Sequence, residues 1–386
     1  MDYMAGTKIA KTRRAVLVAG NFGRLYLGVL AVFIVSIGVS VSNAEQPLSI
    51  NHSRAELEDM WKTRIKSFLD VGTVPLIDLQ SSLKRHDGNA YLPDALVAMD
   101  EVGVALIAFD GYQARRTSKH QKGYRWGYYI HKVVNLYPNR FLLASNGGIN
   151  KNWVRGKKSF IRQTEEQVKS GVYPIMGEFE FRHYMSRRQC RAGRTFRDVY
   201  VPIEGSNAHR LFQLSAETGV AFVIHNEPED AALRGLERML QFYPKAKVIH
   251  AHFGQIRQPD RQRGFTPERV RFLLRNYSNL YFDLATGYPG RIYRCFGNET
   301  LDTVIWRREG DRQFLSLDDR WKEIIIDFAD RFVVGFDYGG GRGPLANFIR
   351  KRASNIRLIM RDLPEKARHD IGYRNAWRLI TGRVWR

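Results

Sequence analysis

The stretch 220–255 decides how this 386-residue chain is organised. It begins VAFVIHNEPED at Val220 and ends KAKVIHAHFGQ at Gln255, with an amphipathic segment between the two. Each half holds an apolar, β-branched run that ends in histidine: His225 in the first, and His250 and His252 in the second. Such runs are typical of buried parallel strands, whose carboxyl ends carry the functional groups of α/β folds. The stretch therefore predicts imidazoles from two neighbouring strands at one edge of a sheet, which suits a metal site.

The same alternation of apolar strands and amphipathic helices continues along the chain. Candidate strands cover 74–80, 103–109, 140–146, 172–181, 220–225, 246–252, 279–284 and 331–337. Candidate helices cover 53–69, 92–101, 126–137, 160–170, 207–218, 231–242, 267–276, 319–329, 344–361 and 364–380. This order predicts an α/β protein built as a (β/α)8 TIM barrel over 74–386. The strand-to-helix connections are the long ones, so we expect the working face at the carboxyl ends of the strands.

The first 44 residues have the pattern of a targeting segment rather than of a folded domain. Basic residues between Lys8 and Arg24 precede an apolar run, 25–41, which ends in Ser42-Asn43-Ala44. This pattern predicts a secretory signal peptide, 1–44, cleaved after Ala44. The alternative is an uncleaved membrane anchor, since the apolar run is just long enough to span a bilayer. We expect an exported protein, periplasmic or secreted and otherwise membrane-anchored, with a linker and helix over 45–73.

Charge and cysteine content narrow the class further. The formal net charge is +22, which favours anionic partners. Only two cysteines are present, Cys190 and Cys295, so the chain is neither a disulfide scaffold nor a cysteine-rich zinc ribbon. The sequence leaves open whether these two cysteines pair, because it does not give the distance between them.

Acidic and imidazole side chains recur where the predicted strands end. Glu178 and Glu180 end the fourth strand, His225 the fifth and His252 the sixth, and Asp337 ends the eighth. One glutamate and two histidines with an open position suit a catalytic zinc ion. Such an ion lowers the pKa of a bound water from about 15.7 to about 7, and a neighbouring carboxylate can move the proton.

Three motifs resemble the amidohydrolase superfamily of metal-dependent hydrolases, and the subgroup that includes aminocarboxymuconate-semialdehyde decarboxylase in particular. They are His252-Phe253-Gly254, Gly335-Phe336-Asp337 and the late run Asn375-Ala376-Trp377-Arg378-Leu379. The resemblance implies that His225 is a metal ligand and that His252 is a ligand or a catalytic residue. It also implies that Asp337 is a ligand or a proton shuttle. His250 is then a core histidine or a partner of a ligand.

The first strand departs from this family. Its members normally end that strand Asp-x-His-x-His, whereas here Gln80 and Ser82 follow Asp78 at the two histidine positions. Amide and hydroxyl groups are poor zinc ligands compared with imidazole. One interpretation keeps a single divalent metal, held by Glu178, His225 and His252, as the resemblance to N-acetylglucosamine-6-phosphate deacetylases implies. The other is a barrel that has lost its metal chemistry.

Glu178 has a resemblance of its own. The pair Gly177-Glu178 is similar to the Gly-Glu of TatD-type deoxyribonucleases, in which that glutamate is a ligand. Glu180 remains the alternative, because alternate residues of a strand share a face. The alternative for one or both glutamates is a salt bridge with Arg182 or Arg187 instead of a metal.

Arginines on the predicted strand-to-helix loops indicate the substrate. We take Arg182, Arg187 and Arg291, together with Gln80, as substrate-binding residues, because guanidinium groups bind carboxylate and phosphate in a bidentate manner. The sequence thus predicts hydrolysis of an amide, ester or phosphoester in an anionic small molecule, with Asp337 and His252 as the catalytic residues. The alternatives are a non-catalytic barrel that binds a polyanion or an envelope partner, a decarboxylase, and a TatD-like nuclease. Nucleic acid is not the expected partner, because the strand-one histidines are missing.

Overall fold

The computed structural model describes residues 50–83, 90–111, 127–147, 151–295, 297–339 and 343–386. The chain divides into Met1–Ala44 and Glu45–Arg386, and every element below belongs to the second unit. The predicted signal segment lies outside the described residues, as do Gly340, Gly341 and Arg342. No helix within the described ranges combines the length and apolar character needed to cross a membrane.

The framework consists of two parallel sheets. One has the order β1-β2-β3, and the other has the order β13-β8-β7-β6-β4, with β5 added antiparallel beside β4. The parallel strands are β1 (Leu76–Ser82), β2 (Val104–Asp110), β3 (Phe141–Leu143), β4 (Ile175–His183), β6 (Ala221–Asn226), β7 (Val248–His250), β8 (Leu280–Asp283) and β13 (Phe332–Val333). Each lies within or beside a strand predicted from the sequence, so the α/β class is confirmed.

The two sheets meet along both of their edges. Ala144 forms a parallel bridge with Ile175 between β3 and β4, and Asp78 forms one with Val334 between β1 and the end of β13. These junctions are isolated bridges rather than strand ladders, so the described residues do not form a continuously hydrogen-bonded closed barrel.

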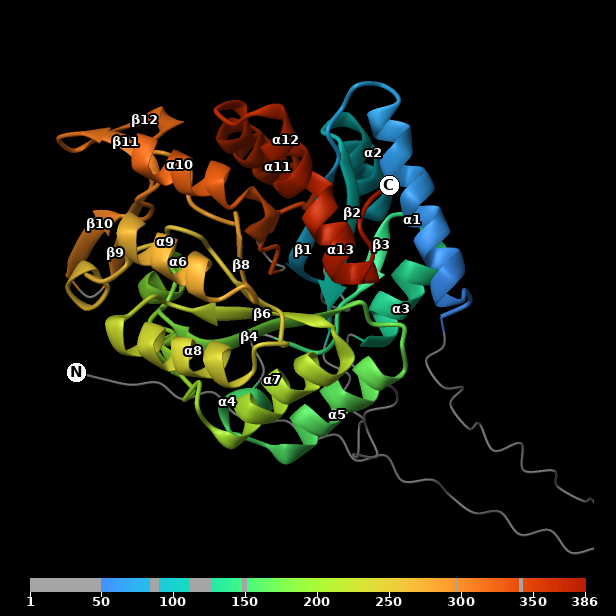
Figure 1. Ribbon diagram of the computed structural model, residues 1–386, viewed down its shortest axis with the longest axis horizontal. Coiled ribbons are helices and arrows are strands. Elements are labelled where there is room, and N and C mark those ends of the chain that lie inside the picture. The colour runs from blue at the N-terminus through green and yellow to red at the C-terminus, as the bar shows by residue number, and fades with distance from the viewer. Residues whose placement is uncertain (1–49, 84–89, 112–126, 148–150, 296, 340–342) are drawn as a thin grey trace, which may run out of the picture. The chain divides into compact units, whose positions relative to one another are not determined.

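Helices separate the parallel strands, as the alternating pattern predicts (Figure 1). They are α1 (Arg54–Leu69), α2 (Leu92–Glu101), α3 (Gly127–Leu136), α4 (Lys151–Val154), α5 (Lys158–Lys169), α6 (Arg187–Arg191), α7 (Ser206–Thr218), α8 (Asp230–Phe242), α9 (Pro267–Asn276), α10 (Asp319–Asp327), α11 (Leu345–Arg361), α12 (Glu365–His369) and α13 (Asn375–Thr381). Helix α1 begins with a capping box: the Ser53 hydroxyl accepts from the Glu56 amide, and the Glu56 carboxylate accepts from the Ser53 amide.

The predicted connection 285–318 contains structure of its own. Two antiparallel hairpins lie in it: β9 (Ile292–Cys295) pairs with β10 (Asn298–Leu301), and β11 (Trp306–Glu309) pairs with β12 (Arg312–Leu317). A further short strand, β5 (Val199–Tyr200), follows α6. Cys190 on α6 forms a disulfide with Cys295 on β9, with their Cα atoms 5.7 Å apart. The pairing that the sequence left open therefore joins the loop after β4 to the loop after β8.

Side-chain alternation places the candidate site on the inner face of the strands. On β6, Phe222 and Ile224 belong to the core cluster shared with the surrounding helices, whereas Val223 belongs to a second cluster that includes Trp61 of α1 and Trp377 of α13. His225 follows Val223 by two residues and so lies on the inner face. Strand β6 thus places the imidazole of His225 at the end of an otherwise apolar inner face.

Candidate metal centre

Glu178 within β4, His225 near the end of β6 and His252 just after β7 come together in space. The Nδ1 atom of His225 lies 2.9 Å from Oε1 of Glu178, and Nε2 of His252 lies 3.0 Å from that same Nδ1. Nε2 of His252 is 3.5 Å from Oε1 of Glu178. Within the described ranges, these three form the one group of histidine, cysteine and acidic residues with the geometry to hold a metal ion. The geometry thus brings together the residues that the sequence proposed as ligands.

The outer nitrogen of each imidazole contacts a hydrogen-bond acceptor. Nδ1 of His252 lies 3.0 Å from the carbonyl oxygen of Ala285, and Nε2 of His225 lies 3.3 Å from Oε1 of Glu227. Because a carbonyl or carboxylate oxygen only accepts, each of these ring nitrogens carries a proton and donates it. The inner nitrogens of the neutral rings therefore present lone pairs to each other and to the Glu178 carboxylate.

Three lone pairs that face one another are stabilised either by a proton on one imidazole or by a metal ion between them, and the spacing of the donor atoms fits a divalent metal. Zinc ligands at about 2.0–2.2 Å in a tetrahedron lie roughly 3.3–3.6 Å from one another. The three separations in this chain, from 2.9 to 3.5 Å, are close to that range. Two imidazoles and one carboxylate also leave a fourth position for water or substrate, as catalytic zinc sites do.

Without a metal, a proton occupies part of this site. Burial lowers the pKa of His225, but hydrogen bonds with Glu178 and Glu227 outweigh it and raise that pKa to about 9. Burial raises the pKa of Glu178, but hydrogen bonds with His225 and His252 hold it well below its usual range. Glu178 is thus an ionised carboxylate facing two imidazoles.

The two histidines of the sixth strand do not share a face, contrary to the expectation from alternation. β7 ends at His250, and His252 has a backbone φ of 63°, which turns its side chain away from the strand pattern. The His250 ring lies in the core, with its centroid 5.4 Å from that of Phe282, and burial lowers its pKa to about 4. His250 is therefore a neutral core histidine, one of the two roles proposed for it.

Glu180 is excluded from the cluster by a buried ion pair. Its carboxylate accepts hydrogen bonds from both terminal nitrogens of Arg197, one of them at 2.9 Å. The expectation that these glutamates pair with Arg182 or Arg187 is therefore wrong for Glu180, whose partner lies on the loop after α6. Glu178 is left as the carboxylate of the cluster.

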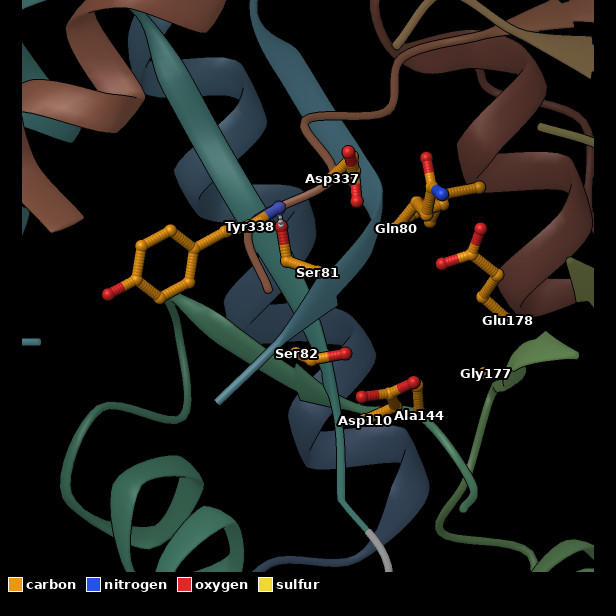
Figure 2. Close-up of a pocket in the computed structure, with 10 residues that line it drawn as sticks. Gln80, Ser81, Ser82, Asp110, Ala144, Gly177, Glu178, Asp337 and Tyr338 are labelled. Atoms are coloured by element: carbon orange, nitrogen blue, oxygen red, sulfur yellow. Dashed lines mark hydrogen bonds between the residues drawn. The ribbon is translucent and has the colours of Figure 1, made fainter. Parts of the chain in front are cut away.

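A small pocket lies beside Glu178 and carries several further polar groups. It is lined by Leu79, Gln80, Ser81, Ser82, Asp110, Ala144, Gly177, Glu178, Asp337 and Tyr338. Figure 2 shows Glu178, Gln80 and Asp337 gathered in one part of the pocket wall and Asp110 with Ser82 in another. The predicted catalytic Asp337 and substrate residue Gln80 are thus neighbours of the ligand cluster.

Asp337 has an unusual backbone conformation. Its φ of 57° is rare outside glycine, and its amide donates to the carbonyl oxygen of Gln80 at 2.7 Å. Its Oδ2 lies 3.7 Å from a terminal nitrogen of Arg352 on α11. Non-glycine residues in this region cost free energy and cluster at functional sites, which agrees with the role proposed for Asp337.

Asp110 was not among the candidate residues from the sequence. It ends β2, is buried, and hydrogen-bonds with Ser82. Burial raises its pKa to about 7, although the Ser82 hydrogen bond acts in the opposite direction. The sequence signal for this residue is a carboxylate directly after the apolar run 104–109.

The predicted substrate arginines divide into internal and exposed groups. Arg182 is buried: its Nε donates to Glu229 at 2.6 Å, and its Nη1 donates to Asp198. Its donors are used within the protein, so its assignment to substrate binding is corrected. Nε of Arg291 lies 2.9 Å from Asp302 while much of its side chain stays exposed, and Arg187 is exposed on α6.

The fold and the cluster define an α/β protein with a Glu-His-His site at its strand ends. No protein-family model and no curated protein matches this sequence. Solved structures that match it include a Staphylococcus aureus protein classed as an amidohydrolase, at 10% identity and a TM-score of 0.46, covering 79% of this chain and 99% of that one. 4-Oxalomesaconate hydratase from Rhodopseudomonas palustris matches at 14% identity and a TM-score of 0.43, covering 84% and 92%.

2,6-Dihydroxybenzoate decarboxylase matches at 11% identity and a TM-score of 0.42, covering 79% of this chain and 99% of that one. Two of the matched structures carry the name amidohydrolase, which is also the name of the superfamily that the sequence motifs resemble. At these identities and TM-scores, the matches do not identify the reaction of this chain.

Proposed function

We propose that this chain is a metal-dependent hydrolase of the amidohydrolase type. The observation that carries the proposal is the meeting of Glu178, His225 and His252, with the outer nitrogens of both imidazoles already bound to acceptors. We infer that the eight parallel strands belong to a (β/α)8 barrel, because bridges join the two sheets at both edges in chain order. This arrangement supports an enzyme over a barrel that has lost its metal chemistry.

We assign the residues of the site different roles in a hydrolytic reaction. Glu178, His225 and His252 would hold one divalent ion, most simply zinc, which as a Lewis acid polarises a carbonyl or phosphoryl oxygen and acidifies a nearby water. Asp337 is the general acid and base, and its half-buried carboxylate lines the same pocket as Glu178. It takes a proton from the attacking water and passes that proton to the leaving group. Gln80 lies 3.5 Å from Nε2 of His252 and offers its amide to a bound substrate.

The substrate is proposed to be an anionic small molecule, which the net charge of +22 supports. The described pocket wall carries carboxylates, hydroxyls and an amide rather than basic groups. We therefore propose that exposed arginines of the surrounding loops bind the negative charge of the substrate, and Arg187 and Arg291 are our candidates. The bond that is cleaved stays open among amide, ester and phosphoester.

We also propose that the protein is exported and loses residues 1–44. The disulfide between Cys190 and Cys295 supports this, because disulfides persist mainly in oxidising compartments. Mass spectrometry of the protein purified from its own cells tests the proposal. A mature amino terminus at Glu45 is expected, whereas an intact amino terminus would favour the membrane-anchor alternative.

The function is tested by metal content and turnover together. Purified protein should contain close to one equivalent of a divalent metal and should hydrolyse members of a panel of anionic amides, esters and phosphoesters. Asp337→Asn should keep the metal and lose most of the turnover, since the amide cannot move the proton. A chain that folds but binds no divalent metal would leave only the non-catalytic barrel.

A further inference from the structure

We propose that Glu227 is the residue that positions His225 for metal binding, by fixing its ring with Nδ1 toward the metal and Nε2 protonated. This inference rests on the proposed metal centre and concerns which ring nitrogen binds. Glu227 comes directly after β6, two residues beyond His225, and is 3% exposed. Its Oε1 lies 3.3 Å from Nε2 of His225, on the opposite side of the ring from Glu178.

The Glu227 carboxylate is itself held by two donors. Nη1 of Arg257 donates to Oε1 at 2.8 Å, and the side-chain amide of Gln262 donates to Oε2 at 3.3 Å. The backbone amide of Glu227 donates to the carbonyl oxygen of Arg182 at 2.8 Å. Both oxygens and the main chain are thus fixed, so that the carboxylate presents one defined acceptor to the imidazole.

Arg257 is fixed in turn by the loops that surround it. Its Nη1 also donates to the carbonyl oxygen of Tyr184 at 3.1 Å, and its guanidinium carbon lies 5.6 Å from the Tyr293 ring centroid. The Tyr293 hydroxyl donates to the carbonyl oxygen of Met185 at 2.9 Å. These contacts join the loop after β4 to the β9–β10 hairpin, which the disulfide also connects. The orientation of one ligand therefore depends on two loops that do not themselves reach the metal.

The alternative is that Glu227 serves only to neutralise the buried Arg257. Arg257 already has a second carboxylate nearby, since its Nε lies 3.7 Å from Asp302. Neutralisation also does not explain why a single atom, Oε1 of Glu227, contacts both Nη1 of Arg257 and Nε2 of His225. A carboxylate that accepts from the outer nitrogen of a ligating histidine fixes its tautomer and raises its basicity.

Glu229 provides a matched control two residues further along the chain. Its carboxylate accepts from Arg182 and from the Tyr184 hydroxyl and has no described contact with His225. Zinc affinity is measured by competition with a chelator for the wild type, Glu227→Gln and Glu229→Gln. We expect Glu227→Gln to bind zinc about 10- to 100-fold more weakly, because its neutral amide is a weaker acceptor for the imidazole than a carboxylate and its NH₂ group cannot accept from Gln262. Glu229→Gln should match the wild type.

A second measurement uses only the wild-type protein, so its result does not depend on whether a variant folds. Wild-type protein labelled with ¹⁵N and loaded with ¹¹³Cd should show cadmium–nitrogen coupling to Nδ1 of His225 and a protonated Nε2. Coupling to Nε2, or equal zinc affinity of Glu227→Gln and the wild type, would overturn the inference while leaving the metal centre in place. A wild-type chain that binds neither zinc nor cadmium would instead overturn the proposed function.

Discussion

Nε2 of His252 lies 3.0 Å from Nδ1 of His225, although 27 positions separate the two residues. Since Ala285 and Glu227 accept from the other nitrogen of each ring, both inner nitrogens are acceptors in the neutral state. Two acceptors at this distance repel one another unless a proton or a metal ion lies between them. The relationship supports the proposal that this buried cluster binds a metal ion.

Asp78 should make the stability of the protein depend on pH. Burial raises the pKa of this carboxyl from 3.8 to about 7, against hydrogen bonds from Ser81, Gln80 and Phe336. The folded state therefore holds its proton more tightly than the unfolded state. The stabilisation is complete below about pH 4 and is lost as the pH rises to about 7.

Asp78→Asn removes this dependence while keeping an acceptor for the amides of Gln80 and Phe336. In chemical unfolding with a chelator present, the free energy of unfolding of the variant should fall less between pH 4 and pH 7 than that of the wild type. Over this pH range the difference should reach about 3 kcal/mol. Parallel curves for the two proteins would show that Asp78 is ionised throughout.

Gly177→Ala should disturb the pocket and the metal site together. A Cβ atom at Gly177 would lie 2.7 Å from Cβ of Asp110 and 2.7 Å from the carbonyl oxygen of Ser145. We expect a loss of about 1–3 kcal/mol in stability, together with weaker zinc binding because Glu178 is the next residue.

Gly171→Ala is the control for that variant. Its φ of 78° disfavours alanine, but no atom lies within 4 Å of the added Cβ. It should lose about 1–2 kcal/mol in stability from the left-handed backbone and keep its zinc affinity. Equal zinc affinities for both alanine variants would show that the backbone around Gly177 can yield without moving Glu178.

The disulfide should contribute strongly to stability. Cys190 and Cys295 are separated by 105 positions. In the chain-entropy model, opening a loop of this length costs about 4–5 kcal/mol. The double variant Cys190→Ser/Cys295→Ser should therefore unfold at a lower temperature than the oxidised wild type, and added dithiothreitol should lower the wild-type value alone. An unchanged unfolding temperature after reduction would contradict this account.

The strands and helices of the framework were predictable because burial imposes a repeating pattern on them. β6 and β7 are short apolar runs, and α2 and α9 match their predicted ranges. The hairpins of 285–318 are absent from the sequence prediction because their four strands are short and because β10, β11 and β12 have few buried residues. Such strands lack the inward apolar face that makes a strand recognisable in a sequence.

The candidate site was predictable where a residue ends an apolar strand and not where a distant partner decides its role. Glu178, His225 and His252 follow from strand ends. Arg182 was misassigned because the acceptors that bury it come from Asp198 and Glu229 on other segments. The side-chain direction of His252 depends on a backbone φ of 63°, which alternation does not predict.

The metal content of His225→Ala tests the central claim most directly. The variant removes one of three ligands, and His250→Leu, which replaces a neutral core imidazole, is the matched control. Elemental analysis of protein purified without added metal should find close to one divalent ion per chain in the wild type and in His250→Leu. His225→Ala should contain almost none while remaining folded by circular dichroism. A folded His225→Ala that retains the wild-type metal content would show that Glu178, His225 and His252 are not the metal centre.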